Sequence, residues 1–353
     1  MDIINGLDDF CIKEGCAVTI GKFDGVHKGH QKLIKDVVSR AKINGIRSCV
    51  ITIENPFIFK NDHKDDSVIT EGTDSTKEEY DDSSKQKSEN TKIDNETYQK
   101  KVESNLTATK KLTVFDEKKL LIEQLGADLL VVFNLDEEFM KLNPYAFIDS
   151  VLMDKLNMQS VSIGPDFRFG HKRDGKAVTF VKASMIYGYG VNVIEKEEQN
   201  EKPVSSTIIR TKLAEGEIKA ANELLGRKYS VSGLTKEGDK IGRKIGFPTM
   251  NIYPDEEKLL PPFGVYATEV TIGGKNYKAV TNVGVRPTVS RGVSRVSVEN
   301  HLLDFKNYGK NDYDKMIVVS FIKKIRDEKK FDSEDKLAEQ IAEDIEIRKT
   351  ILD

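Results

Sequence analysis

The sequence has no tryptophan, only nine prolines and only three cysteines among its 353 residues. Cys11, Cys16 and Cys49 form neither a C-x-x-C pair nor a metal-ligand pattern, which argues against a disulfide scaffold and against a cysteine zinc site. No apolar run approaches the roughly 20 residues that span a bilayer. The first residues also lack the basic-then-apolar order of a signal peptide. These absences predict a soluble, cytoplasmic protein without a membrane partner.

The chain also carries little net charge outside one segment. Residues 61–105 contain thirteen Asp or Glu, seven Lys or Arg and six apolar residues, so their local charge is seven minus thirteen, or −6. The whole chain carries −3, which leaves +3 for the remainder. A near-neutral remainder predicts no nucleic-acid partner. Because 61–105 cannot bury enough apolar surface to offset its ordering entropy, we expect a disordered surface insertion, with a solvated helix as the alternative.

Residues 1–204 alternate short β-branched runs with amphipathic stretches. Strands are expected at 16–21, 47–53, 128–133 and 160–164, and helices at 31–43, 117–125 and 143–156. Strand–helix–strand units at this spacing build a parallel sheet, so the first part is predicted to be an α/β domain. Ligands on such sheets bind beyond the carboxyl ends of the strands.

The pattern changes after residue 227. Short strands separated by glycine and proline turns at intervals of about 10 residues are typical of a small antiparallel β-barrel. A helix is expected from Ser333 to Leu352, with Asp332 or Ser333 as N-cap and with Leu337, Ile341, Ile345 and Leu352 on one side. Residues 205–226 read as a helical connector, so the domains are predicted at 1–204 and 227–353.

Residues 20 to 34, IGKFDGVHKGHQKLI, hold two of the five histidines, placed just ahead of the predicted helix. Glycines let this backbone turn tightly, and the N–H groups that open a helix favour an anion. His27 and His30 are close enough in sequence to meet on the first turn and to donate to phosphate oxygens. A glycine-rich turn with two solvated histidines is the plainer alternative. A zinc pair would need further ligands, and the ending of a Walker A loop is missing.

Three strings in chain order resemble one family. GKFDGVHKGH (21–30) is similar to the G-x-F-D-G-V-H-x-G-H string of bacterial bifunctional riboflavin kinase/FMN adenylyltransferases, also called FAD synthetases. GPDFRFG (164–170) resembles the G-x-D-F-R-F-G loop of that family, and SSTIIR (205–210) resembles its S-S-T-x-I-R motif. The resemblance implies that residues 1–204 form a Rossmann-like nucleotidyltransferase domain that adenylylates FMN with ATP.

The resemblance also implies residue roles at this first site. His27 and His30 are implied to be catalytic, and the rest of these motifs to contact ATP or flavin. ATP or phosphate contacts are implied for Gly21, Phe23, Gly25, Gly29, Ser205, Ser206, Thr207 and Arg210, and flavin contacts for Asp166, Phe167 and Arg168. From residue types alone, Asp166 and Arg168 could be a structural pair between packed phenylalanines, and the S-S-T hydroxyls could simply cap a helix.

Strings in the second part resemble the riboflavin kinase of the same family. GRKIGFPTMNI (242–252) is similar to its G-x-P-T-A-N signature, which implies ATP contacts from Gly242 and Gly246 and Mg²⁺ contacts from Thr249 and Asn251. SVENHLLDF (297–305) is similar to its V-E-T-H-x-x-D-F strand. This match implies that Glu299 takes the proton of the riboflavin 5′-hydroxyl as it attacks the γ-phosphorus of ATP. Arg326 is implied to help close the flavin pocket. Without the resemblance, a barrel turn and a solvent-facing glutamate would explain both strings.

The sequence departs from the family pattern in four places. Met250 and Asn300 stand where alanine and threonine are usual, Pro165 stiffens its loop, and TIENPFIF (52–59) lacks an expected histidine. Since 52–59 is expected beside the adenylyltransferase site, one alternative is a kinase whose N-terminal domain binds flavin without adenylylating it. A flavin-responsive scaffold that uses 61–105 as a partner tail is another. No pattern indicates an oligomeric state.

Overall fold

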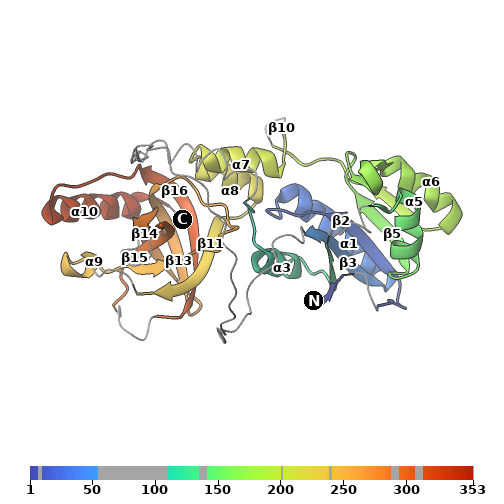
Figure 1. The fold of residues 1–353 in the computed structure, drawn as a ribbon, viewed down its shortest axis with the longest axis horizontal. Helices are drawn as coiled ribbons and strands as arrows, with labels where there is room; N and C mark the ends of the chain where they lie inside the picture. The colour runs from blue at the N-terminus through green and yellow to red at the C-terminus, as the bar shows by residue number, and fades with distance from the viewer. Residues whose placement is uncertain are drawn as a thin grey trace, which may run out of the picture.

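The computed structural model describes residues 1–6, 10–54, 110–134, 141–199, 202–237, 241–287, 294–306 and 313–352. These residues form a sheet-and-helix body and a barrel, with a pair of helices beside their junction (Figure 1). The predicted insertion at 61–105 and the end of the 52–59 segment lie outside the described residues. Within the described ranges, no helix is both long enough and apolar enough to cross a membrane.

A parallel sheet forms the first body, in the strand order β1-β4-β3-β2-β5-β8. Its strands are β1 (Asp2–Asn5), β2 (Cys16–Gly21), β3 (Arg47–Glu54), β4 (Leu129–Asn134), β5 (Met158–Ile163) and β8 (Gly190–Val193). The four strands predicted from apolar runs are confirmed within two residues at each end. Their runs are continuous rather than alternating because helices cover both faces of the sheet.

Helices cover the two faces as separate layers. On one face, α1 (Lys28–Asn44) and α3 (Phe115–Gln124) contribute Ile34 and Ile122 to a core with Val50 and Leu130. On the other face lie α5 (Pro144–Phe147), the π-helical turn η2 (Ile148–Met153) and α6 (Ala177–Tyr187). The single helix predicted at 143–156 is therefore shorter and partly π-helical. The first body is the predicted α/β fold.

The order of the strands reverses beside β2. From β2 the chain proceeds through β3 to β4 on one side, and it then crosses back to place β5 on the other side of β2. In open α/β sheets, ligands bind at the carboxyl ends of the strands where the order reverses. The segments that follow β2 and β5 are the two motif loops, Phe23–His30 and 164–170. The topology therefore brings the two predicted loops to one edge.

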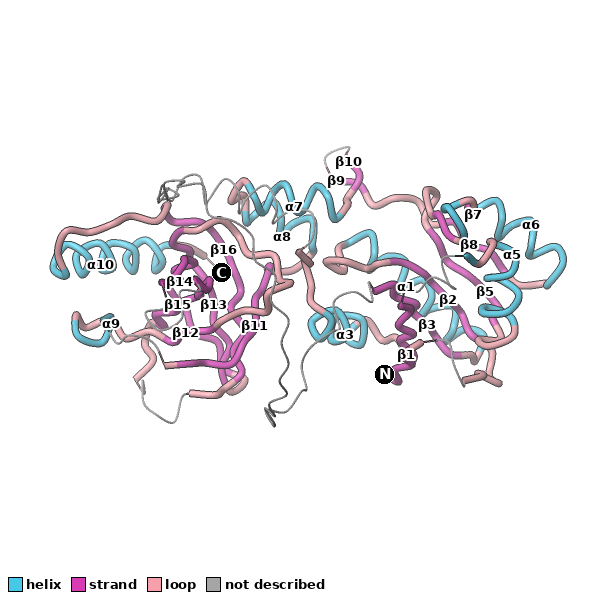
Figure 2. The backbone as a smooth tube through the Cα atoms, in the orientation of Figure 1, coloured by secondary structure: helices cyan, strands magenta, loops and turns pink. Residues whose placement is uncertain are grey.

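The second body is a closed antiparallel barrel in the order β11-β12-β15-β14-β13-β16 (Figure 2). Its strands are β11 (Tyr229–Lys236), β12 (Met250–Ile252), β13 (Gly264–Ile272), β14 (Lys275–Pro287), β15 (Ser294–Leu302) and β16 (Met316–Arg326). The barrel prediction is confirmed. Smaller elements are β6 (Arg168–Phe169), η3 (His171–Arg173), β7 (Gly175–Lys176), β9 (Glu198–Gln199), β10 (Lys202–Pro203) and α9 (Ile241–Lys244).

The C-terminal helix α10 (Glu334–Thr350) packs beside the barrel. Its N-cap is Ser333, whose hydroxyl accepts a hydrogen bond from the backbone N of Lys336 at 3.3 Å. The predicted apolar stripe is wrong at its end, because Leu352 follows the helix and is 90% exposed. The buried side chains of α10 are charged instead. One of them, Arg348, donates to the carbonyl of Thr268 at 3.0 Å.

The connector consists of two helices rather than one, α7 (Ser206–Ala214) and α8 (Ile218–Leu225). The break falls at Gly216, whose φ of 73° lies in the left-handed region that glycine adopts readily. Ile209 and Leu225 belong to the same buried cluster as Tyr229 of the barrel. Leu112, which precedes α3, joins this cluster as well. The two bodies are thus in direct contact through shared apolar packing.

Two of the departures from the family pattern face the barrel interior. Asn300 is fully buried, and its side chain accepts from the Thr281 hydroxyl at 2.8 Å and donates to the Met250 carbonyl at 3.0 Å. Met250 itself is 4% exposed and packs in the core. Both departures from the family pattern therefore concern core packing. Because side chains alternate along a strand, Met250 and Asn300 point to the opposite side of their strands from Asn251 and Glu299.

Candidate functional site

His27 and His30 form a stacked pair at the start of α1. The Nδ1 atom of His27 accepts a hydrogen bond from the backbone N of His30 at 3.3 Å, so His27 is the N-cap of the helix. The ring centroids are 3.6 Å apart, with 18° between the ring planes. The expected proximity is confirmed, but the helix begins at Lys28 rather than at Gln31. Because Nδ1 of His27 accepts, its neutral ring carries the proton on Nε2, where it can be donated to a ligand.

Burial keeps both imidazoles neutral. It lowers the pKa of His27 from 6.5 to about 4; the nearby Asp24 opposes this shift and Arg227 adds to it. Burial also holds the pKa of His30 well below its ordinary value, with further lowering by His27 and Lys118. The Nδ1 atom of His30 is buried and has no hydrogen-bond partner among the described residues.

These shifted values predict a loss of stability in mild acid. Since the folded-state pKa of each histidine is below 6.5, the unfolded chain takes up protons first, and the free energy of unfolding falls from pH 6.5 toward pH 4. Between pH 7.5 and pH 5.5 each histidine should contribute a loss of about 1 kcal/mol. Urea unfolding of the wild type and of His27→Asn at the two pH values would measure the contribution of His27. Equal losses in the two proteins would contradict the expectation.

The turn that carries His27 has a strained backbone. Phe23, Gly25 and Val26 have φ values of 48°, 84° and 38°. A Cβ atom on Gly25 would lie 2.9 Å from Leu112, and one on Gly29 would lie 3.3 Å from the His27 ring. Phe23 is fully buried and meets the His30 ring edge-on at a centroid distance of 5.2 Å. These residues, together with Gly21 at the end of β2, shape the backbone around the histidines.

The S-S-T motif starts α7 and also reaches the first motif. The Ser205 hydroxyl accepts from the backbone N of Ile208 at 3.3 Å, which confirms the capping alternative for that residue. Ser206 Oγ donates to the carbonyl of Asp24 at 2.8 Å, and Arg210 Nη2 lies 2.5 Å from Asp24 Oδ2. Thr207 lies in the first turn of the same helix. The structure therefore joins the two motifs, with Arg210 paired to a carboxylate.

The loop after β5 is partly built into the core. Phe169 is 7% exposed, and its ring lies 4.5 Å from that of Phe180 and 5.7 Å from that of Phe167. Asp166 is exposed and forms an ion pair with Lys196, so the predicted alternative of an Asp166–Arg168 pair is wrong in its partner. Arg168 is exposed on β6. Packed phenylalanines thus support a loop whose polar side chains face solvent at the sheet edge.

Sequence reasoning missed a buried ion pair beside the histidines. Lys118 on α3 and Glu54 at the end of β3 are each 3% exposed and are paired, and Lys118 Nζ also donates to the Lys22 carbonyl at 2.9 Å. Burial alone would raise the pKa of Glu54, but Lys118 and Lys111 outweigh it and lower that pKa. No motif marks Lys118. Its position on the buried side of a predicted helix was the only available signal.

In the barrel, the predicted Glu299 lies between polar residues on the two neighbouring strands. Glu299 on β15 is opposite Asn251 on β12 and opposite Asn282 on β14. Asn251 is 2% exposed, and its Oδ1 has no hydrogen-bond partner in the part of the chain that the structure describes. Thr249 directly precedes β12. The structure therefore places Asn251 beside Glu299, with Thr249 two residues earlier in the chain.

The glycine loop that leads to Thr249 folds back on itself. The carbonyl of Gly242, in α9, accepts from the backbone N of Phe247 at 2.7 Å, and a Cβ on Gly242 would collide with the Phe247 carbonyl. Gly246 follows with a φ of 90°. Glycine is therefore required by the backbone at Gly242 and favoured at Gly246, and the role of both in ATP binding stays a prediction.

A second carboxylate near Glu299 was not predicted. Partial burial and the nearby Glu299 raise the pKa of Glu328, while Arg326 and a hydrogen bond with Asn282 oppose the shift. Arg326 itself forms a forked ion pair with Asp344 of α10, with Nη2 to Oδ2 at 2.8 Å and Nε to Oδ1 at 3.0 Å. The guanidinium is therefore held by the terminal helix, and its contact with flavin stays a prediction.

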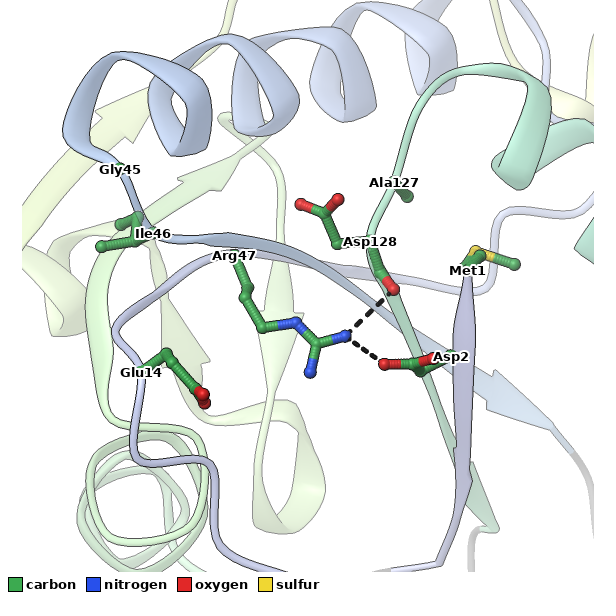
Figure 3. A pocket seen from close by; sticks show the side chains of 8 residues that line it. All are labelled: Met1, Asp2, Glu14, Gly45, Ile46, Arg47, Ala127 and Asp128. Carbon is green, nitrogen blue, oxygen red and sulfur yellow. Dashed lines mark hydrogen bonds and ion pairs between the residues drawn. The ribbon is translucent and has the colours of Figure 1, made fainter.

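A polar hollow at the opposite edge of the sheet does not coincide with either site (Figure 3). It lies at the amino ends of β1, β3 and β4, where Arg47 donates to Asp2 Oδ2 at 2.5 Å and to the Asp128 carbonyl at 3.3 Å. Arg47 and Asp2 form an ion pair within it, and it lies away from the carboxyl edge where such sheets bind ligands. The motif loops mark the better candidate.

Comparison with known proteins matches both bodies. The family model described as riboflavin kinase matches residues 225–352, and the one described as FAD synthetase matches residues 10–79 and 84–208. Proteins named bifunctional riboflavin kinase/FMN adenylyltransferase are similar over nearly the full length. The one from Buchnera aphidicola subsp. Schizaphis graminum is 34% identical, covering 99% of this chain and 98% of its own. Those from Escherichia coli strain K12 and Bacillus subtilis are each 32% identical, covering 98% and 93% of this chain and 96% and 89% of their own.

A solved structure shares the arrangement of both bodies. The crystal structure described as a macrolide-efflux protein from Streptococcus pneumoniae has a TM-score of 0.77 and 23% identity, and the match covers 99% of each chain. At this identity the likeness concerns the fold alone.

Proposed function

The chain belongs to the bifunctional riboflavin kinase/FMN adenylyltransferase family, and from that premise we propose how its residues divide the two reactions. The enzyme phosphorylates riboflavin to FMN with ATP and transfers AMP from ATP to FMN, giving FAD and pyrophosphate. Matches to both family models favour this bifunctional activity over the kinase-only alternative. We assign adenylyl transfer to 1–204, phosphorylation to 227–353 and the link between them to 205–226, in the cytoplasm.

The stacked His27–His30 pair carries the assignment of the adenylyltransferase site. A phosphate oxygen of FMN attacks the α-phosphorus of ATP, the bond to the bridging oxygen breaks, and pyrophosphate leaves. The Nε2–H of His27 and the His30 ring would donate to the charge that develops on the phosphate oxygens. The opening N–H groups of α1 add a favourable field for the anion. We propose that Asp166, Phe167 and Arg168 contact the flavin from the β5 loop.

The contacts of the S-S-T motif support a positioning role within the same site. Ser206 and Arg210 both hold Asp24, the residue between Phe23 and Gly25 in the strained turn. We propose that Arg210 also neutralises a phosphate of ATP, for which its guanidinium fork is suited. Six further residues keep the backbone in the shape that this binding needs: Gly21, Phe23, Gly25, Gly29, Ser205 and Thr207.

In the barrel, the 5′-hydroxyl oxygen of riboflavin attacks the γ-phosphorus, and ADP leaves. Glu299 would accept the hydroxyl proton. Thr249 and Asn251 offer the hard oxygens that Mg²⁺ prefers. The Oδ1 atom of Asn251 is buried and has no hydrogen-bond partner among the described residues, which fits a cation ligand. Such an ion, when bound, would neutralise phosphate charge. Gly242 and Gly246 would let the loop approach the ATP phosphates, and Arg326 would border the flavin.

The metal assignment predicts a change in magnesium dependence. Asn251→Ala should raise the Mg²⁺ concentration needed for half-maximal FMN formation by at least about tenfold, the scale on which ligand-sphere changes reduce metal affinity. FAD formation from supplied FMN should keep its own magnesium dependence, which makes it the internal control. An unchanged midpoint for FMN formation would rule out Asn251 as a ligand.

The function as a whole is tested by incubating the purified chain with riboflavin, ATP and Mg²⁺ and separating the products by chromatography. We expect FMN to appear first and FAD to follow. With FMN supplied in place of riboflavin, FAD should form without a lag. Formation of FMN without any FAD, over a range of magnesium concentrations, would favour the kinase-only alternative.

A further inference from the structure

We propose that Arg227, which lies on the kinase side of the connector, is a positioning residue for adenylyl transfer. It follows α8 and precedes β11, outside the residues assigned above to the adenylyltransferase domain. Its task is to hold the strained turn from which His27 projects. This inference rests on the proposed function of His27 and His30 and extends that site across the domain boundary.

Two hydrogen bonds join Arg227 to the turn. Its Nη2 donates to the carbonyl of Gly25 at 2.7 Å, and its Nη1 donates to the carbonyl of Val26 at 3.2 Å. The planar fork of a guanidinium suits two successive carbonyls and fixes their spacing, whereas a lysine ammonium would meet them as a single point charge. Val26 is the residue directly before the N-cap, so its orientation sets the direction in which the His27 ring points.

The turn needs support from outside. Val26 has a φ of 38°, in a region that β-branched residues rarely adopt, and Gly25 has a φ of 84°. Glycine adopts such a φ readily, but the Val26 conformation is unfavourable and persists only where the surroundings hold it. Arg227 supplies part of that support from a different domain. Without it, the turn should sample other conformations and carry the imidazole with it.

Further hydrogen bonds hold the same turn. Gln31 Nε2 bridges the Val26 carbonyl at 2.9 Å and the carbonyl of Leu225, the last residue of α8, at 2.8 Å. The Gly25 backbone N donates to Thr113 Oγ1 at 3.0 Å. The turn is thus bound by the connector as well as by its own domain. Among the side chains that bind the Gly25 and Val26 backbone, Arg227 is the charged one.

The electrostatics agree with a fixed, charged Arg227. Burial lowers its pKa to about 10, with Glu117 opposing the shift, so the guanidinium stays protonated at neutral pH. Glu117 in turn pairs at 2.5 Å with Lys258, which is 3% exposed and also donates to the Leu112 carbonyl at 2.8 Å. This chain of contacts crosses between α3 and the barrel. The charge of Arg227 is thus attracted to an acidic group that is itself fixed at the boundary.

The test replaces Arg227 in the full-length enzyme and measures both reactions on each preparation. Arg227→Met should lower kcat for FAD formation from supplied FMN by at least about tenfold, since a misplacement near 1 Å can cost about 10²-fold. The KM for FMN and the kinase activity should stay within about twofold, because this residue supplies orientation rather than substrate binding. Arg227→Lys should recover only part of the lost kcat. Lys228→Met is the matched control, because Lys228 pairs with Glu269 at 3.3 Å on the barrel.

Undiminished FAD formation by Arg227→Met would overturn the inference. So would a parallel loss of both activities in the Met and Lys variants, since it would mean that Arg227 only stabilises the fold. If the wild-type chain itself formed no FAD, the proposed function would fail and this inference with it. A selective loss of kcat for FAD formation, partly recovered by lysine, supports the positioning role.

Discussion

Replacing His27 by asparagine is expected to lower FAD formation from supplied FMN by about 10² to 10³-fold, the usual loss when one donor to a transition-state anion is removed. Asparagine is among the best N-cap residues, so α1 should keep its start. The variant therefore removes the Nε2–H donor of the imidazole while it preserves the capping contact seen between Nδ1 and the backbone N of His30. A loss of activity then reports on chemistry rather than on the helix.

The measurement compares rates of FAD formation at saturating FMN and ATP, with riboflavin phosphorylation by the same preparation as the folding control. Lys35→Ala serves as the matched variant, because Lys35 is exposed on the same helix. His30→Gln should show a loss of similar size, and the double variant should lose little more, because groups that act as a unit are not additive. Normal FAD formation by His27→Asn would refute the role of the histidine pair.

The second large effect is expected in the barrel. Glu299→Gln should lower FMN formation from riboflavin by about 10² to 10⁴-fold, the range typical of general acid–base groups. Glutamine keeps the shape of the side chain and an oxygen that can accept the hydroxyl of Ser297, which lies 3.4 Å from Glu299 Oε1. It cannot take up the proton of the attacking hydroxyl. The barrel should therefore stay folded while phosphorylation fails.

The chain contains its own control for this variant, since Glu299→Gln should still convert supplied FMN to FAD at the wild-type rate. Mixing Glu299→Gln with His27→Asn should restore FAD formation from riboflavin, because free FMN made by one variant is a substrate for the other. Full kinase activity in Glu299→Gln would exclude Glu299 as the proton acceptor and would direct attention to Glu328, the carboxylate beside it.

Local pattern accounts for most of the fold. The β-branched runs at 16–21 and 47–53 became β2 and β3, and the glycine-punctuated segments after residue 227 became the barrel. Errors fell where local signals compete with contacts that a sequence does not display. The start of α1 was misplaced because a histidine serves as its cap, and the end of the stripe on α10 was misplaced because the helix stops at Thr350, before Leu352.

For the candidate sites, too, the sequence indicated the residues that stand in local motifs and missed those that reach the sites only through tertiary contacts. His27, His30 and Glu299 stand in continuous motifs, so residue type and spacing were enough to single them out. Lys118, Arg227 and Glu328 stand in no motif that points to these sites. Each acquires its place because a helix, the connector or the end of a strand returns to a site formed elsewhere in the chain.

The amino-acid order alone determined which segments become strands and helices, and which two groups of side chains are the candidates for the chemistry, because periodicity and motif spacing are local properties. Only the tertiary structure decided that β5 returns beside β2 and that Arg227 reaches the turn before His27. Contacts between residues roughly 200 positions apart depend on how whole elements pack and on which buried polar groups must find partners. Such packing depends on the folded chain as a whole.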